Sequence, residues 1–111
     1  MFSMNRFRTL VICVALTAGP RVLLAADKGD AEKGKAVFQQ CAVCHNADND
    51  QKKMGPGLKG LFAKAKLTDG KKPTEASVRS KIEAGGNGMP AYKDMLTDAE
   101  KNNLVAYLKT L

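Results

Sequence analysis

Two cysteines and the only histidine form the most chemically informative pattern in this 111-residue sequence. Cys41 and Cys44 are separated by two residues, and His45 follows the second cysteine directly. The spacing C-x-x-C-H can hold a metal ion, form a disulfide or attach a haem covalently. Other features of the sequence are needed to decide which of these three chemistries applies.

Residues 1–25 have the layout of a secretory signal peptide. A short basic region with two arginines precedes an apolar run over residues 10–19, and small residues follow at Ala25. The apolar run is shorter than the roughly 20 residues of a membrane-spanning helix. We expect cleavage near Ala25, which removes Cys13 and leaves 26–111 as one domain without a transmembrane span. An uncleaved membrane anchor is the alternative.

The oxidising compartment that an exported chain enters permits a disulfide between Cys41 and Cys44. A thioredoxin-type dithiol needs a βαβ context, and no run of β-branched residues with strand period follows Asp27. A closed zinc site needs about four Cys or His ligands, whereas residues 26–111 contain three. A haem brings its own equatorial nitrogens, so two thiols and one imidazole suffice. We therefore favour a haem attached at both cysteines, with His45 as one axial ligand.

Three methionines after Asp27 are candidates for the second axial position. Met89 lies in the segment AGGNGMP, where three glycines permit close approach of the backbone and a proline fixes the chain after the thioether. Met95 precedes the last predicted helix, where packing in the core is the simpler interpretation. Met54 is only nine residues from His45 and ranks a distant second. Met89 is the predicted ligand.

The sequence from about Asp30 to Leu111 resembles the class I c-type cytochromes. The likeness rests on four features in order: a helix leading to CAVCH, then GPGLKGLF at 55–62, GNGMPAY at 86–92 and LTDAEKNNLVAYLKTL at 96–111. The resemblance implies an all-α cytochrome c fold. About four helices would wrap around one covalently attached haem, with the N- and C-terminal helices crossing.

The resemblance also assigns roles to individual residues. It implies that Cys41 and Cys44 form the thioethers, that His45 is the proximal ligand and that Met89 is the distal ligand. It further implies that the carbonyl of Pro56 accepts a hydrogen bond from the other ring nitrogen of His45. Such a bond would orient the imidazole and strengthen it as an iron ligand.

Helix signals in the sequence agree with this architecture. Asp30 is a predicted N-cap, and TDAE at 97–100 is a capping box for a last helix with an apolar stripe. We expect Gly34 and Phe38 of the first helix to cross the last helix near Leu104 and Tyr107.

Two further helices are expected between these ends. Residues 58–67 predict a short helix, and Thr74 or Ser77 begins another helix that ends at the glycines 85 and 86. The predicted haem lining consists of Leu58, Leu61, Phe62, Leu67, Ile82, Tyr92 and Leu96.

One-electron transfer is the function that these expectations support. Imidazole and thioether together would occupy both axial positions, so substrate could not reach the iron, which favours a periplasmic carrier over an enzyme. Two alternatives keep the haem: a ligand-binding or peroxidase-like protein with a labile Met89 bond, and an electron-entry subunit of a larger exported oxidoreductase.

Positive charge is concentrated in one region of the chain. Removal of residues 1–25 takes away three of the 18 basic residues and leaves a net charge of +4. Residues 52–72 hold seven lysines and a single acid, Asp69. We expect a monomer whose lysines steer docking to acidic patches on redox partners, although a lysine run can also be simply a solvated face. A nucleic-acid partner is not expected.

Overall fold

The structure, a computed structural model, describes residues 28–111. The predicted signal peptide, its cleavage position and Cys13 lie outside this range. Three α-helices, α1 (Ala31–Phe38), α2 (Glu75–Ala84) and α3 (Asp98–Leu108), are joined by long irregular segments that include one 3-10 turn, Leu61–Ala63. Within residues 28–111 there is no strand, only an isolated bridge between Gly86 and Met89. The predicted all-α fold is confirmed.

Side-chain caps fix where α1 and α3 begin. The Asp30 carboxylate accepts hydrogen bonds from the amides of Glu32 and Lys33, at 2.9 and 3.3 Å. At α3, the Thr97 hydroxyl accepts from the Glu100 amide, and the Glu100 carboxylate accepts from the Thr97 amide, both at 3.1 Å. These bonds satisfy amides that have no partner within the helix. Both predicted caps are therefore confirmed.

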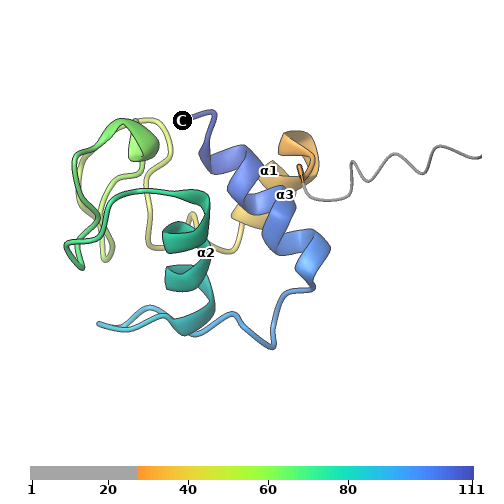
Figure 1. Cartoon of the computed structure of the whole chain (residues 1–111). Coiled ribbons are helices and arrows are strands. Elements are labelled where there is room, and N and C mark those ends of the chain that lie inside the picture. The colour runs from red at the N-terminus through yellow and green to blue at the C-terminus, as the bar shows by residue number, and fades with distance from the viewer. Residues whose placement is uncertain (1–27) are drawn as a thin grey trace, which may run out of the picture.

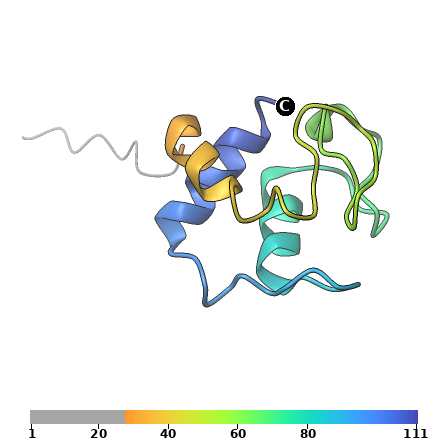
Figure 2. The ribbon, with the colours of Figure 1, turned by 180° about the vertical axis from the view of Figure 1, so that it is seen from behind.

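Helices α1 and α3 lie against each other. Helix α1 is seen behind α3 in Figure 1 and in front of it in the reverse view of Figure 2. Gly34 permits this contact, since a Cβ at that position would lie 1.8 Å from the Asn103 carbonyl oxygen. The rings of Phe38 and Tyr107 pack with their centroids 5.3 Å apart. The expected crossing is present, with Asn103 and Tyr107 as the residues nearest to Gly34.

The expected helix over 58–67 is reduced to the three-residue turn Leu61–Ala63. Gly60 adopts a left-handed conformation with φ of 67°, and Lys64 is extended, so a helix can continue in neither direction. Helix α2 begins after Thr74, whose hydroxyl forms a capping box with Ser77. Thr74 and Ser77, which were predicted as alternative starts of this helix, therefore form its cap together.

The core contains side chains from all three helices and from the segments between them. Leu104 on α3 is the most buried side chain, with 1% of its surface exposed. Met95 is 63% exposed, so the expectation that it packs in the core is wrong. The tight turn in which the Met95 amide bonds to the Tyr92 carbonyl buries the next residue, Leu96, instead. In the part of the chain that the structure describes, no helix is long and apolar enough to cross a membrane.

Candidate functional site

A pocket of about 590 Å³ brings the predicted site residues together. Cys41, Cys44, His45, Pro56 and Met89 all line it. Its volume is within the ~300–1,000 Å³ that is usual for cofactor sites. Residues up to 48 positions apart in the sequence therefore share one cavity.

A turn at the end of α1 presents the two thiols and the imidazole. The amides of Cys41 and Ala42 bond to the Phe38 carbonyl at 2.8 and 3.0 Å, and those of Cys44 and His45 bond to the Cys41 carbonyl at 3.1 and 3.0 Å. Both cysteines are half-buried free thiols. Burial, and secondarily the charge of Cys44, raises the pKa of Cys41 above its ordinary value of 9.0.

The orientation of His45 is fixed by the segment at 55–56. Nδ1 of the imidazole lies 2.8 Å from the carbonyl oxygen of Pro56. A carbonyl can only accept, so Nδ1 carries the proton and Nε2 keeps a lone pair for a metal. Gly55 packs against the ring, where a Cβ would lie 2.5 Å from Cε1. Sequence reasoning did not single out Gly55, because its contact is with a side chain ten residues away.

Met89 lies at the end of a tight turn after α2. Gly86 and Met89 exchange two backbone hydrogen bonds of 2.9 and 3.1 Å, and the central residues Asn87 and Gly88 have φ of 52° and 90°. Positive φ at both central residues is the signature of a type I′ turn, which the pair Asn-Gly favours. Sequence reasoning noted the glycines but missed this turn signal.

The other two methionines are placed differently from Met89. Met89 is half-buried and packs against the hydrophobic core. Met54 also borders the pocket and its Sδ lies 3.9 Å from Sγ of Cys44, but 80% of its surface is exposed. Met95 is not among the pocket residues.

Most of the pocket wall is apolar, as expected. Five of the seven predicted lining residues border it: Leu58, Leu61, Leu67, Ile82 and Tyr92. Phe62 and Leu96 do not, because Phe62 packs against the outside of the core and Leu96 is buried within it. Four buried hydrophobic residues that were not predicted as lining also reach the pocket: Phe38, Val78, Leu104 and Leu108.

The residues of the pocket fit an iron porphyrin. Two adjacent thiols are available for thioether bonds, an imidazole has its remaining nitrogen free, and the surrounding wall is apolar. Residues 31–111 match the family description "Cytochrome c". The chain belongs to the cytochrome c family.

Individual relatives agree with this assignment. Cytochrome c6 of Picosynechococcus sp. is 32% identical over 105 residues, a match that covers 88% of this chain and 90% of the relative. Cytochrome c2 of Rhodopseudomonas palustris is 39% identical over 54 residues, which is 49% of this chain and only 37% of that relative. The crystal structure of cytochrome c6 from the diatom Phaeodactylum tricornutum superposes with a TM-score of 0.59 at 33% identity, covering 74% of this chain and 93% of that one.

Membership of the cytochrome c family identifies the cofactor and the broad function. The cofactor is a covalently attached haem c, and the protein is a monohaem electron carrier that interacts with redox partners. Cys41 and Cys44 are the only cysteines among residues 28–111. Three of the seven lysines between residues 52 and 72, Lys52, Lys64 and Lys66, border the pocket of this cytochrome.

Proposed function

We propose that this cytochrome is a periplasmic one-electron carrier in which His45 and Met89 bind the iron of a haem attached at Cys41 and Cys44. The observation that carries the proposal is the pocket itself, which is lined by all four of these residues. The hydrogen bond between Nδ1 of His45 and the Pro56 carbonyl supports the ligand role of Nε2. The 80% exposure of Met54 supports the choice of Met89.

The residues of this chain hold the cofactor and set its properties. When bound, the haem supplies one-electron chemistry between ferric and ferrous iron. The imidazole of His45 and the thioether of Met89 together favour the reduced state, so we expect a fairly high reduction potential. If His45 and Met89 both hold the iron, no position on it would remain for substrate, which supports a carrier over an enzyme.

Export to the periplasm is supported by the layout of residues 1–25, with cleavage near Ala25. The mature protein would be the monomeric domain 26–111. N-terminal sequencing of protein recovered from the periplasmic fraction tests both points. A mature chain that begins near Ala26 is expected, and an intact N-terminus in the membrane fraction would contradict the proposal.

Docking is proposed to use the lysines beside the pocket. Lys52 and Lys66 are exposed and border it, so both residues would lie beside the haem. Acidic patches on exported redox partners are the complementary surface. Clustered charge of this kind raises association rates by about 10- to 1,000-fold at low salt.

An absorption spectrum of the matured protein in both oxidation states tests the carrier proposal. We expect a six-coordinate spectrum in each state, reversible one-electron reduction and slow binding of cyanide or carbon monoxide at neutral pH. Rapid binding of either ligand to the native protein would contradict the proposal and favour the ligand-binding or peroxidase-like alternative.

A further inference from the structure

Lys101 is the one charged or polar residue that is buried among residues 28–111. Only 4% of its surface is exposed, although it belongs to the first turn of α3 and directly follows Glu100 of the capping box. A buried charge is costly unless it has partners, so its contacts indicate why it is retained there.

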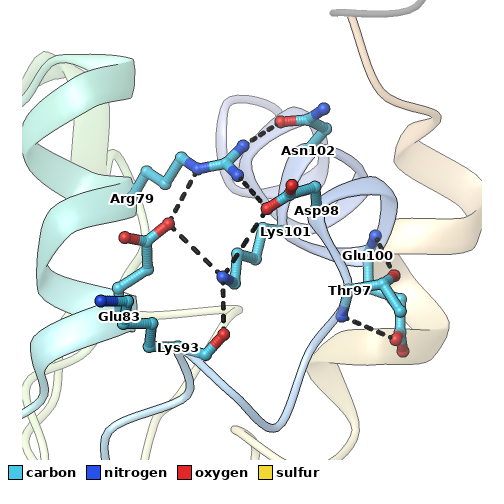
Figure 3. Close-up of polar contacts among 8 residues, drawn as sticks. All are labelled: Arg79, Glu83, Lys93, Thr97, Asp98, Glu100, Lys101 and Asn102. Atoms are coloured by element: carbon cyan, nitrogen blue, oxygen red, sulfur yellow. Dashed lines mark hydrogen bonds and ion pairs between the residues drawn. The ribbon is translucent and has the colours of Figure 1, made fainter.

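The ammonium of Lys101 lies among three oxygen acceptors from different parts of the fold (Figure 3). Nζ donates to the backbone carbonyl of Lys93 at 2.8 Å and lies 3.5 Å from a Glu83 carboxylate oxygen and 3.8 Å from one of Asp98. Arg79 binds the same two carboxylates, at 3.0 and 2.8 Å. Asp98 is largely exposed and contributes little. The main contacts of Lys101 are therefore the Lys93 carbonyl and Glu83.

Lys93 belongs to the loop that carries Met89. The amides of Tyr92 and Lys93 bond to the carbonyls of Ile82 and Glu83 near the end of α2, at 3.0 and 3.3 Å. The Gly86–Met89 turn lies between α2 and this point. Three glycines with positive φ, at 85, 86 and 88, give the segment backbone freedom. Its position therefore depends on the points where it is attached to the helices.

The Lys101 contact attaches this loop to α3. The backbone bonds of Tyr92 and Lys93 tie the loop only to α2, the helix from which it departs. Lys101 belongs to the helix that packs against α1 and supplies Leu104 and Leu108 to the pocket wall. The ammonium thus joins the Met89 loop to the side of the molecule that holds Cys41 and His45.

We propose that Lys101 is a positioning residue whose ammonium holds the Lys93 carbonyl against α3 and so keeps the thioether of Met89 on the haem iron. The inference rests on the proposed ligation by Met89. Lys101 does not touch the pocket, since it is absent from its lining. It acts through the three residues of backbone that lie between Met89 and Lys93.

The test uses the holoprotein with Lys101→Met, which keeps the apolar stem and removes the ammonium. The first measurement is the rate at which imidazole binds ferric protein, because this rate is limited by departure of Met89 from the iron. The second is amide hydrogen exchange at Tyr92 and Lys93. We expect both rates to rise about tenfold, as for the loss of one hydrogen bond to a charged group.

Lys109→Met is the matched control. Lys109 is the C-cap residue of the same helix and pairs with Glu75 at the first residue of α2, the end of α2 opposite to Glu83. Its variant should keep both wild-type rates, and Lys101→Arg, which keeps a charged donor, should recover most of the loss. Equal effects of Lys101→Met and Lys109→Met, or no effect of Lys101→Met, would overturn the proposal. If Lys101→Met does not fold, the same measurements on Glu83→Gln decide: raised rates support the proposal, and unchanged rates overturn it.

The two measurements separate this inference from the proposed ligation. If imidazole binding is insensitive to Met89→Ala in the wild-type background, the ligation is wrong. Exchange at Tyr92 and Lys93 reports on the loop independently of the iron. Unchanged exchange in Lys101→Met therefore overturns the role of Lys101 even where Met89 is the ligand.

Discussion

The tautomer and the orientation of the His45 ring depend on two neighbours, Pro56 and Gly55. The Pro56 carbonyl fixes the proton on Nδ1, and Gly55 leaves room for the ring beside the backbone. The amide of Gly55 bonds in turn to the carbonyl of Cys44 at 2.8 Å, which closes the segment back onto the cysteine motif. A single short loop thus sets both the tautomer and the orientation of the imidazole.

Haem attachment gives the first prediction. Replacing both Cys41 and Cys44 by alanine removes both thioether bonds, so no haem should stay with the chain after denaturation and acid extraction. The measurement is the haem absorbance of the extracted polypeptide. Cys13→Ala is the matched control and should retain its haem, because Cys13 lies in the expected signal peptide. Covalent haem in the double variant would contradict the assignment.

At the scale of single residues, the sequence predicted the residues of the motifs. It predicted only some of the neighbouring residues that position them. The order of CAVCH, GPG and GMP in the chain is sufficient to predict that Cys41, Cys44, His45 and Met89 share one site. The role of Gly55 depends on a distance to a side chain ten residues away, which no local pattern encodes. The positive φ values at 87 and 88 were encoded locally, in the pair Asn-Gly.

Among the helices, the contact between α1 and α3 forms the frame of the fold, and α2 attaches to α3 through charged side chains. Arg79 on α2 bonds to Glu83, to Asp98 and to Asn102, the last two on α3 (Figure 3). No buried side-chain nitrogen or oxygen within residues 28–111 lacks a hydrogen-bond partner. The α2–α3 contact therefore combines polar pairing with the apolar packing of the core.

The α1–α3 contact gives the second prediction. In Gly34→Ala the new Cβ would meet the Asn103 carbonyl oxygen, a backbone atom that cannot rotate away. The two helices must separate, and we expect the free energy of unfolding to fall by about 3 kcal/mol. Denaturant unfolding of the holoprotein measures this free energy. Lys33→Ala, an exposed change on the same helix, should alter it by less than about 0.5 kcal/mol. Equal stability of the two variants would contradict the contact.

The third prediction concerns pH. The hydrogen bond from Arg79, helped by the charges of Lys101 and Arg79, lowers the pKa of Glu83 below its ordinary value of 4.5. A lowered pKa means that this stabilisation is fully present above pH 4.5 and is lost as pH falls through the folded value. Thermal unfolding between pH 7 and pH 3 should show Glu83→Gln less stable than wild type at neutral pH, with the difference narrowing below pH 4.5. A difference that stays constant to pH 3 would contradict the ionised role of Glu83.

Helix starts were predictable because they depend on side chains next to each other in the sequence, as at Asp30 and Thr97. The prediction of a helix over 58–67 was wrong because it relied on the spacing of apolar residues and gave too little weight to Gly60. In the protein the left-handed conformation of Gly60 prevents a helix from running through this position. The prediction that Met95 is buried was wrong for a related reason. The turn at Tyr92 decides which of two adjacent apolar residues is buried, and the sequence alone does not place that turn.

For the molecule as a whole, the lysine-rich segment 52–72 gives the fourth prediction. Lys52 and Lys66 border the pocket, while Lys71 and Lys72 are also exposed but do not border it. Replacing Lys52 and Lys66 by glutamine should slow electron transfer to an acidic partner at low salt. It should also flatten the dependence on salt, as screening shortens from about 10 Å at 0.1 M to about 3 Å at 1 M.

The control for docking is the pair Lys71 and Lys72 replaced by glutamine, which removes the same charge from the same segment. Stopped-flow rates across the salt range compare the two variants with wild type. A larger loss in the Lys52 and Lys66 variant supports docking beside the pocket. Equal losses would mean that only net charge matters, and a wild-type rate that does not fall with salt would exclude electrostatic steering.

The central claim is that this chain holds its haem iron between His45 and Met89. The most direct measurement is the weak far-red absorption of methionine-ligated ferric haem, recorded for wild type, Met89→Ala, Met54→Ala and Met95→Ala. We predict that the band is present in wild type, is absent in Met89→Ala and persists in the other two variants. A band that survives in Met89→Ala, or that disappears in Met54→Ala instead, would contradict the claim.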